Sequence, residues 1–197
     1  MKIYLIRHGQ TTGDIEDRYG GAYDDELSDK GKIQAHELAN KLGSSGIQIL
    51  LCSPMTRAQQ TAKILVSKLH CEIKTIENLK ERNKNGVLSG MTQDEAQKKY
   101  PKFVEEIKDY RNQIQGAESQ EDFAKRIKKV ITDVTTDISY STIGMVTHGG
   151  PMWVVLKNIL NVSITDITDC AYAVIDTDGR KLSLERVEGI RYKMDKS

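Results

Sequence analysis

Three short and almost entirely apolar runs constrain the fold of this chain more than any other feature. They are Ile3–Ile6, Ile47–Cys52 and Thr142–Thr147, and each has the length of a strand and ends at polar residues. Strands with one face in solvent alternate apolar and polar residues. Runs this apolar are therefore expected in central strands that are covered on both faces.

Helical patterns lie between these runs. Ile33, Leu38 and Leu42 recur at helical spacing after the capping pair Ser28–Asp29, and Gly43 ends that segment. Further helices are expected over about 56–69, 121–138 and 152–160. The alternation of strands and helices along 197 residues favours a single α/β domain spanning residues 1–197. We expect a three-layer α/β/α sandwich with a mostly parallel central sheet.

Two segments depart from this alternation. Near the C-terminus, apolar segments at 171–176 and 182–187 flank Asp178–Gly179, which is a strong hairpin signal. The polar stretch 83–120 carries only weak helical patterns, near 93–100 and 103–114. We interpret it as a small helical cap insertion that sets substrate selectivity.

Composition excludes several classes of protein. With 29 Lys and Arg against 28 Asp and Glu, the net charge is +1, which excludes a globally basic nucleic-acid binder. No apolar run is long enough to span a bilayer, and residues 3–6 are too few for a secretory signal. The 3 cysteines lack the spacing of a disulfide framework or a zinc cluster. We therefore expect a cytoplasmic protein without nucleic-acid or membrane partners; the oligomeric state stays open.

Chemically active side chains follow each of the three strands. Arg7 and His8 end the first, Ser53 and Arg57 follow the second, and His148 follows the third. In open α/β sheets, ligands bind beyond the carboxyl ends of the strands, where these residues would meet. Arginine forks match phosphate oxygens, and histidine is a competent nucleophile toward phosphorus. A metal site is the competing interpretation, but two nearby guanidinium charges oppose a divalent cation.

These residues resemble the motifs of the histidine phosphatase superfamily, which is also called phosphoglycerate mutase-like. The similarity follows the family's order from the first strand to about residue 150, and this ordered set is more specific than any one motif. The matching segments are Arg7–His8–Gly9 with Thr11, then Ser53–Pro54 with Arg57–Ala58, then Leu79–Lys80–Glu81, and finally His148–Gly149–Gly150.

The resemblance implies a mechanism. His8 would attack phosphorus and become transiently phosphorylated. Arg7, Arg57 and His148 would bind the equatorial oxygens, and Glu81 would protonate the leaving oxygen and then activate water. No cofactor or metal is implied. The further phosphate- or substrate-binding residues implied by the resemblance are Thr11, Arg18 and Gly149.

Two positions depart from the family pattern. Asp14 stands where the family often has an asparagine that helps to bind phosphate. Because phosphate repels a carboxylate, we expect Asp14 to point away or to bind a substrate hydroxyl. The loop after Glu81 is one residue longer than usual, so Glu77 or Asp94 are alternatives for the acid.

Phosphomonoester hydrolysis of a small phosphorylated metabolite is the first functional interpretation. The alternatives are phosphoglycerate mutase-type transfer and a non-catalytic module that binds a phosphorylated ligand. Family mutases tend to be longer and to carry paired arginines after the acid, whereas this chain has no Arg–Arg pair. Arg82, Lys84 and Arg111 are the candidates for recognising a second negative group on the substrate.

Overall fold

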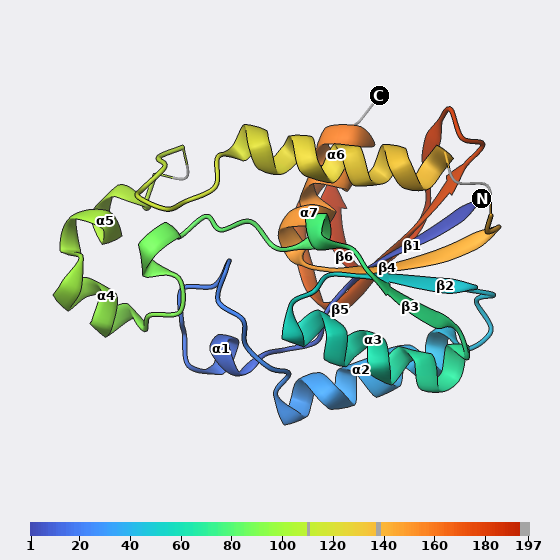
Figure 1. Ribbon diagram of the computed structural model, residues 1–197, viewed down its shortest axis with the longest axis horizontal. Coiled ribbons are helices and arrows are strands. Elements are labelled where there is room, and N and C mark those ends of the chain that lie inside the picture. Colours follow the sequence, from blue (N-terminus) through green and yellow to red (C-terminus); the bar gives the residue numbers. More distant parts are fainter. Residues whose placement is uncertain (110, 137–138, 194–197) are drawn as a thin grey trace.

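The computed structural model describes residues 1–109, 111–136 and 139–193. It contains a six-stranded sheet with helices on both faces (Figure 1). The strand order is β3-β2-β4-β1-β5-β6; the four strands from β3 to β1 are parallel, and β5 runs antiparallel to both β1 and β6. The predicted three-layer fold with a mostly parallel sheet is therefore confirmed. The strands are β1 Lys2–Arg7, β2 Ile49–Cys52, β3 Glu72–Thr75, β4 Thr142–Thr147, β5 Ser163–Thr177 and β6 Leu182–Lys193.

The helices divide between the two faces of the sheet and the segment beyond its edge. Helices α2 and α3 cover one face, and α6 with α7 covers the other (Figure 1). Within the described ranges, no helix combines the length and the apolar character needed to cross a bilayer. The helices are α1 Thr12–Ile15, α2 Asp29–Leu42, α3 Thr56–Leu69, α4 Gln93–Lys99, α5 Pro101–Glu106, α6 Gln120–Thr136 and α7 Gly149–Trp153, with short turns η1 Glu77–Leu79, η2 Gly86–Leu88 and η3 Val154–Ile159.

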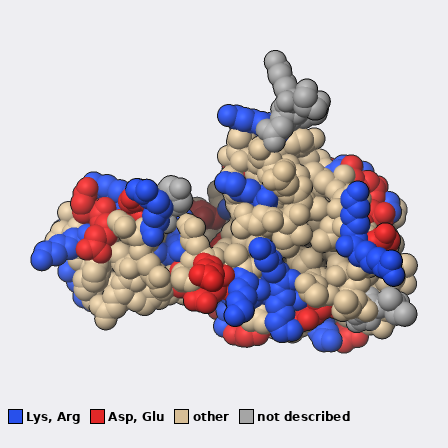
Figure 2. Space-filling view, turned by 90° about the horizontal axis from the view of Figure 1, so that it is seen from above, with Lys and Arg blue, Asp and Glu red and all other residues tan. Residues whose placement is uncertain are grey.

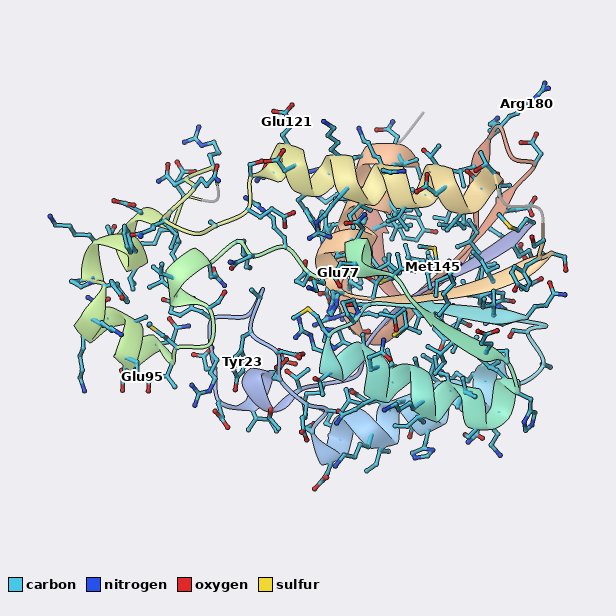
Figure 3. The ribbon with its side chains drawn as sticks, viewed as in Figure 1. Tyr23, Glu77, Glu95, Glu121, Met145 and Arg180 are labelled. Atoms are coloured by element: carbon cyan, nitrogen blue, oxygen red, sulfur yellow. The ribbon has the colours of Figure 1, made fainter. Side chains whose placement is uncertain are left out.

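The apolar runs are buried because the strands present alternate residues to two separate cores. In β1, Ile3 and Leu5 pack under α6 and α7, whereas Tyr4 and Ile6 pack against α2 and α3. Met145 of β4 lies fully buried in the core on the α6 side (Figure 3). Burial on both faces explains why no polar residue interrupts these runs.

Several element boundaries differ from the predicted ones. Strand β2 begins at Ile49 rather than Ile47, and β3 was not predicted because it is a short polar strand at the sheet edge. The strands of the C-terminal hairpin extend beyond the predicted ranges. Bulges at Cys170 (φ +53°) and Gly189 (φ +70°) interrupt the alternation of apolar and polar residues, so the sequence pattern shows only part of each strand. The helix expected over 121–138 is α6, with residues 137–138 outside the described ranges.

Other predicted helices also shift. Helix α5 ends at Glu106 instead of reaching residue 114, and Ile33 of α2 is exposed instead of packing with Leu38. The helix expected over 152–160 begins already at Gly149 and continues as the π-helical turn η3. Its early start places the helix N-terminus directly after His148, next to the site described below.

Residues 83–120 hold α4 and α5, which extend away from the three layers (Figure 1). This segment packs on a small cluster of its own, centred on Leu88, Ala96 and Ile114. The surface is hollowed between this segment and the main body (Figure 2). A cavity of about 890 Å³ lies there, at the carboxyl ends of β1 and β4.

Candidate active site

The structure brings His8 and His148 together. Their strands, β1 and β4, are parallel neighbours, and Arg7 pairs with Thr147 at their ends. The segments that follow the two strands therefore leave the sheet at the same edge. The two rings are buried, with centroids 5.0 Å apart and planes inclined by 62°. This separation leaves both imidazoles within reach of one small anion.

Arg57, from the first turn of α3, lies between the two rings. Its Nε–H points at His8 Nε2 (3.1 Å) and at His148 Nδ1 (3.2 Å). Because a guanidinium only donates, both of these ring nitrogens accept. The opposite nitrogens donate: His8 Nδ1–H to the Gly9 carbonyl (2.7 Å) and His148 Nε2–H to Ser53 Oγ (2.8 Å). Each ring is thereby held as one neutral tautomer.

Burial and positive neighbours favour these neutral rings. Burial is the main cause that lowers the pKa of His8 well below its ordinary value, with Arg57 and Arg7 adding to the effect and the Gly9 carbonyl opposing it. The pKa of His148 is lowered by burial first, then by His8, Arg57 and Arg7. His8 Nε2 consequently keeps a lone pair at neutral pH, which a nucleophile requires.

Arg7 ends β1 and is anchored by β5. Its guanidinium donates to the Ile167 carbonyl and pairs with Asp169 (Nη2 to Oδ1, 3.2 Å). Its Nε–H is buried and has no hydrogen-bond partner among the described residues. At Gly149, an added Cβ would meet only this nitrogen, at 4.0 Å. Open space beside an unpaired donor suits an oxyanion.

Glu81 supplies a carboxylate to the same cavity. Its Oε2 accepts from the Gly150 amide (2.9 Å) and its Oε1 from the Arg82 amide (2.7 Å). Of the two alternative acids, Glu77 lies on η1 (Figure 3), forms an ion pair with Lys80 and lines a neighbouring hollow. Asp94 belongs to α4 and does not line the cavity. Among these three acids, only Glu81 lies in the cavity.

Thr11, Asp14 and Arg18 line the same cavity as His8. Thr11 caps α1: its hydroxyl accepts from the Asp14 amide (3.2 Å), and its own amide donates to Asp14 Oδ2 (2.9 Å). Asp14 lines the cavity, and one of its carboxylate oxygens accepts the hydrogen bond of this cap. Arg18 also lines the cavity and donates to the Gly90 carbonyl (2.7 Å).

The three residues predicted to recognise a second negative group divide. Arg82 and Lys84 line the cavity, whereas Arg111 does not. Arg111 binds Asp109 through Nε and Nη2 instead, at 2.9 Å and 2.6 Å. The two that remain, Arg82 and Lys84, follow Glu81 closely in the chain and line the same cavity.

Sequence reasoning missed the residues that hold the arginines and Glu81. Asp25 pairs with Arg57, and Asp169 pairs with Arg7. Arg126 donates to the carbonyls of Asn78, Lys80 and Glu81 and forms an ion pair with Glu118, which fixes the backbone that carries the acid. Asp25 lies in the loop before α2 and Asp169 lies in β5, and neither stands in one of the recognised sequence motifs.

Together these contacts describe a pocket for a tetrahedral anion. It offers a neutral imidazole whose acceptor nitrogen faces Arg57, two guanidinium donors, a helix N-terminus and a carboxylate for proton transfer. The fold and the site together define an α/β protein with a pocket suited to a phosphate group.

Comparison with known proteins agrees. The family model of the histidine phosphatase superfamily (branch 1) matches residues 3–188, so the chain belongs to this superfamily, as its motifs predicted. Phosphoserine phosphatase 1 of Hydrogenobacter thermophilus is 29% identical over 190 residues, covering 92% of this chain and 89% of that protein. A probable phosphoglycerate mutase GpmB of Proteus mirabilis is 28% identical over 194 residues, covering 95% and 85%. The crystal structure of the alpha-ribazole phosphatase from Shigella flexneri superposes with a TM-score of 0.83 at 22% identity, covering 96% of each chain.

Proposed function

We propose that this chain hydrolyses phosphomonoesters of small metabolites through a phosphohistidine on His8. One observation carries the proposal: His8 has a fixed neutral tautomer whose Nε2 lone pair faces Arg57 Nε at 3.1 Å. Membership of the histidine phosphatase superfamily supports it. A phosphoryl group entering here would displace this hydrogen bond and take Arg57 Nε–H onto one of its oxygens.

The reaction has two halves. In the first, His8 Nε2 attacks phosphorus, the P–O bond to the leaving group breaks, and Glu81 gives its proton to the departing oxygen. In the second, the Glu81 carboxylate removes a proton from water, the water oxygen attacks phosphorus, and the N–P bond breaks. Orthophosphate leaves and His8 returns to its neutral form. Arg7 Nε–H, Arg57 Nε–H and the α7 N-terminus stabilise the equatorial oxygens.

The reaction needs no metal in this proposal. Two guanidinium groups supply the positive charge that a divalent cation would otherwise provide, and their presence opposes its binding. Activity is therefore expected to survive EDTA unchanged. Restoration of EDTA-treated enzyme by added Mg²⁺ or Zn²⁺ would contradict this.

We propose that residues 83–120 act as a cap that selects the substrate within a single domain of residues 1–197. Arg18, Arg82 and Lys84 line the cavity, which supports a role for them in binding a second negative group. The relatives' names suggest the substrates to try first, namely phosphoserine, phosphoglycerate and alpha-ribazole phosphate. A cytoplasmic location stays a prediction that rests on the cysteine content.

Trapping the intermediate tests the proposal. The protein is mixed with an aryl phosphate, quenched and denatured, and its bound phosphate is assayed for stability. We expect phosphate that is labile in acid and stable in base, and none on the His8→Ala variant. Orthophosphate binding without any trapped intermediate would favour a non-catalytic module. Activity on 3-phosphoglycerate that depends on 2,3-bisphosphoglycerate would favour the mutase.

A further inference from the structure

Arg57 is held by a buried carboxylate that no sequence motif announced. Asp25 Oδ1 accepts from Arg57 Nη1 at 2.7 Å, and the two side chains are only 8% and 6% exposed. Asp25 lines the cavity and belongs to the loop between α1 and α2, the loop that also carries Tyr23 (Figure 3). An ion pair this buried interacts more strongly than one at the surface.

The loop engages the terminal nitrogens of Arg57. Besides Asp25, Nη1 donates to the Tyr23 carbonyl (2.8 Å), and Nη2 contacts the Gly21 carbonyl (3.4 Å). The Nε–H is the donor that faces the two histidine rings. The loop therefore sets which part of the guanidinium meets the phosphate.

The backbone leaves room for this carboxylate. An added Cβ on Gly13 would lie 2.5 Å from Asp25 Oδ2 and 3.3 Å from its Cγ. Gly13 is buried in α1 and packs against the acid. Any larger residue at position 13 would push Asp25 away from Arg57.

We propose that Asp25 is a positioning residue that acts through Arg57: it orients the guanidinium and offsets its charge, which keeps phosphate affinity low. The inference rests on the proposed function, because it concerns the orthophosphate that leaves in each turnover. A dianion beside an uncompensated guanidinium binds tightly. One unit charge at about 6 Å changes the affinity for a single negative charge by roughly tenfold at an effective dielectric of about 40, and by more at a lower dielectric. Weak product binding favours repeated turnover.

The test measures orthophosphate binding by calorimetry together with the kcat and KM for an aryl phosphate. Asp25→Asn keeps an oxygen for Arg57 Nη1 but removes the charge. We expect its Kd for orthophosphate and its KM to fall about tenfold, with kcat no higher than in the parent protein. Gly13→Ala displaces the carboxylate without altering either partner, so we expect a smaller shift in the same direction.

Asp24→Asn is the matched control. Asp24 is the adjacent acid, and its replacement by asparagine removes the same charge. Its carboxylate accepts from the amide (2.6 Å) and the hydroxyl (2.9 Å) of Thr56 at the start of α3 rather than from Arg57. We expect its Kd and KM to stay within twofold of the parent. A structural defect alone lowers the folded fraction but leaves Kd unchanged, so the affinity distinguishes the two roles.

A double-mutant cycle checks the route. In an Arg57→Ala background, Asp25→Asn should tighten orthophosphate binding much less, because only the through-space repulsion by the carboxylate is then removed. Tightening that is as large there as in the parent protein, or equal affinities for the Asp25 and Asp24 variants, would overturn the inference while leaving the hydrolase proposal intact. A parent protein that neither binds orthophosphate nor turns over would instead refute the proposed function.

Discussion

Gly150→Ala should disable the proposed general acid without removing it. Gly150 is in the first turn of α7, and its amide donates to Glu81 Oε2 at 2.9 Å. An alanine Cβ there would overlap Glu81 Oε1 and lie 2.9 Å from Glu81 Cδ and 3.1 Å from Phe123 Cζ. The carboxylate is the flexible partner in this clash, so it moves.

The size of the effect follows from this overlap. Unstrained carbon contacts lie at about 3.5–4.0 Å, so the carboxylate has to shift by about 1 Å. A misplacement of this size costs about 100-fold in rate, and general acid catalysis is worth about 10²–10⁴-fold. Stability changes little: alanine gains about 1 kcal/mol of helix propensity, which offsets much of the lost hydrogen bond. We expect the free energy of unfolding to change by less than about 2 kcal/mol.

The assay compares two esters on the same variants. Hydrolysis of an alkyl phosphate needs a proton on its leaving oxygen, whereas that of a nitrophenyl phosphate does not. The rate compared is kcat/KM, which depends only on the steps up to phosphoryl transfer to His8 and not on the later attack of water. By this measure, Gly150→Ala and Glu81→Gln should both slow the alkyl ester by about 100-fold or more and the aryl ester by less than about fivefold. Thermal melts provide the control for folding.

Gly149→Ala provides the contrast, since its Cβ would meet only Arg7 Nε, at 4.0 Å. That change crowds the phosphate rather than the acid, so it should slow both esters alike. Equal slowing of both esters by Gly150→Ala or Glu81→Gln would refute Glu81 as the proton donor. Full alkyl-ester activity in Gly150→Ala would refute the geometry.

Three further predictions concern the residues around this site. Burial lowers the pKa of His8 and His148 below the ordinary value of 6.5, so the unfolded chain takes up protons first as the pH falls below about 6.5, and the free energy of unfolding decreases there. Denaturation at a series of pH values should show that the unfolding free energy of His8→Ala depends less steeply on pH in this range. An equal dependence in the parent protein and the variant would contradict this. Ser53→Ala leaves the buried His148 Nε2–H without its acceptor, which should cost about 1–3 kcal/mol in denaturant unfolding and lower kcat; an unchanged midpoint would rule out this bond. Arg126→Ala releases the backbone that carries Glu81, so alkyl-ester hydrolysis should fall more than aryl-ester hydrolysis, and a uniform loss would show that Arg126 does not position the acid.

The central fold was predictable because burial on both faces leaves a strong sequence signal. Strand β4 has the predicted bounds Thr142–Thr147, since each of its residues packs against a core or ends the run. The edge strand β3 gives no such signal, because its side chains are largely exposed and its sequence is polar. The long hairpin was only partly visible, since Cys170 adopts a left-handed conformation and breaks the alternation of β5.

The candidate site was predictable where chemistry follows directly on a strand. His8 and His148 end adjacent parallel strands, so the topology alone brings them together. The pairing of Arg7 with Asp169 joins β1 to β5 through a tertiary contact across most of the chain, and no local pattern encodes it. The position of Glu81 depends on the conformation of its loop, and Arg126 of the later helix α6 holds that loop through the Glu81 carbonyl.

The paired arginines bear on the choice between enzyme and binding module. A module that retains a phosphorylated ligand gains from guanidinium groups whose charge is free, because the dianion then supplies the counter-charge. Here Arg57 pairs with Asp25 and Arg7 pairs with Asp169. These carboxylates do not engage the two Nε–H groups: that of Arg57 faces the histidine rings, and that of Arg7 has no partner among the described residues. Both can donate to the equatorial oxygens as charge moves onto them. We therefore expect such a site to bind its product weakly and to stabilise the transition state by orientation, which favours turnover over retention.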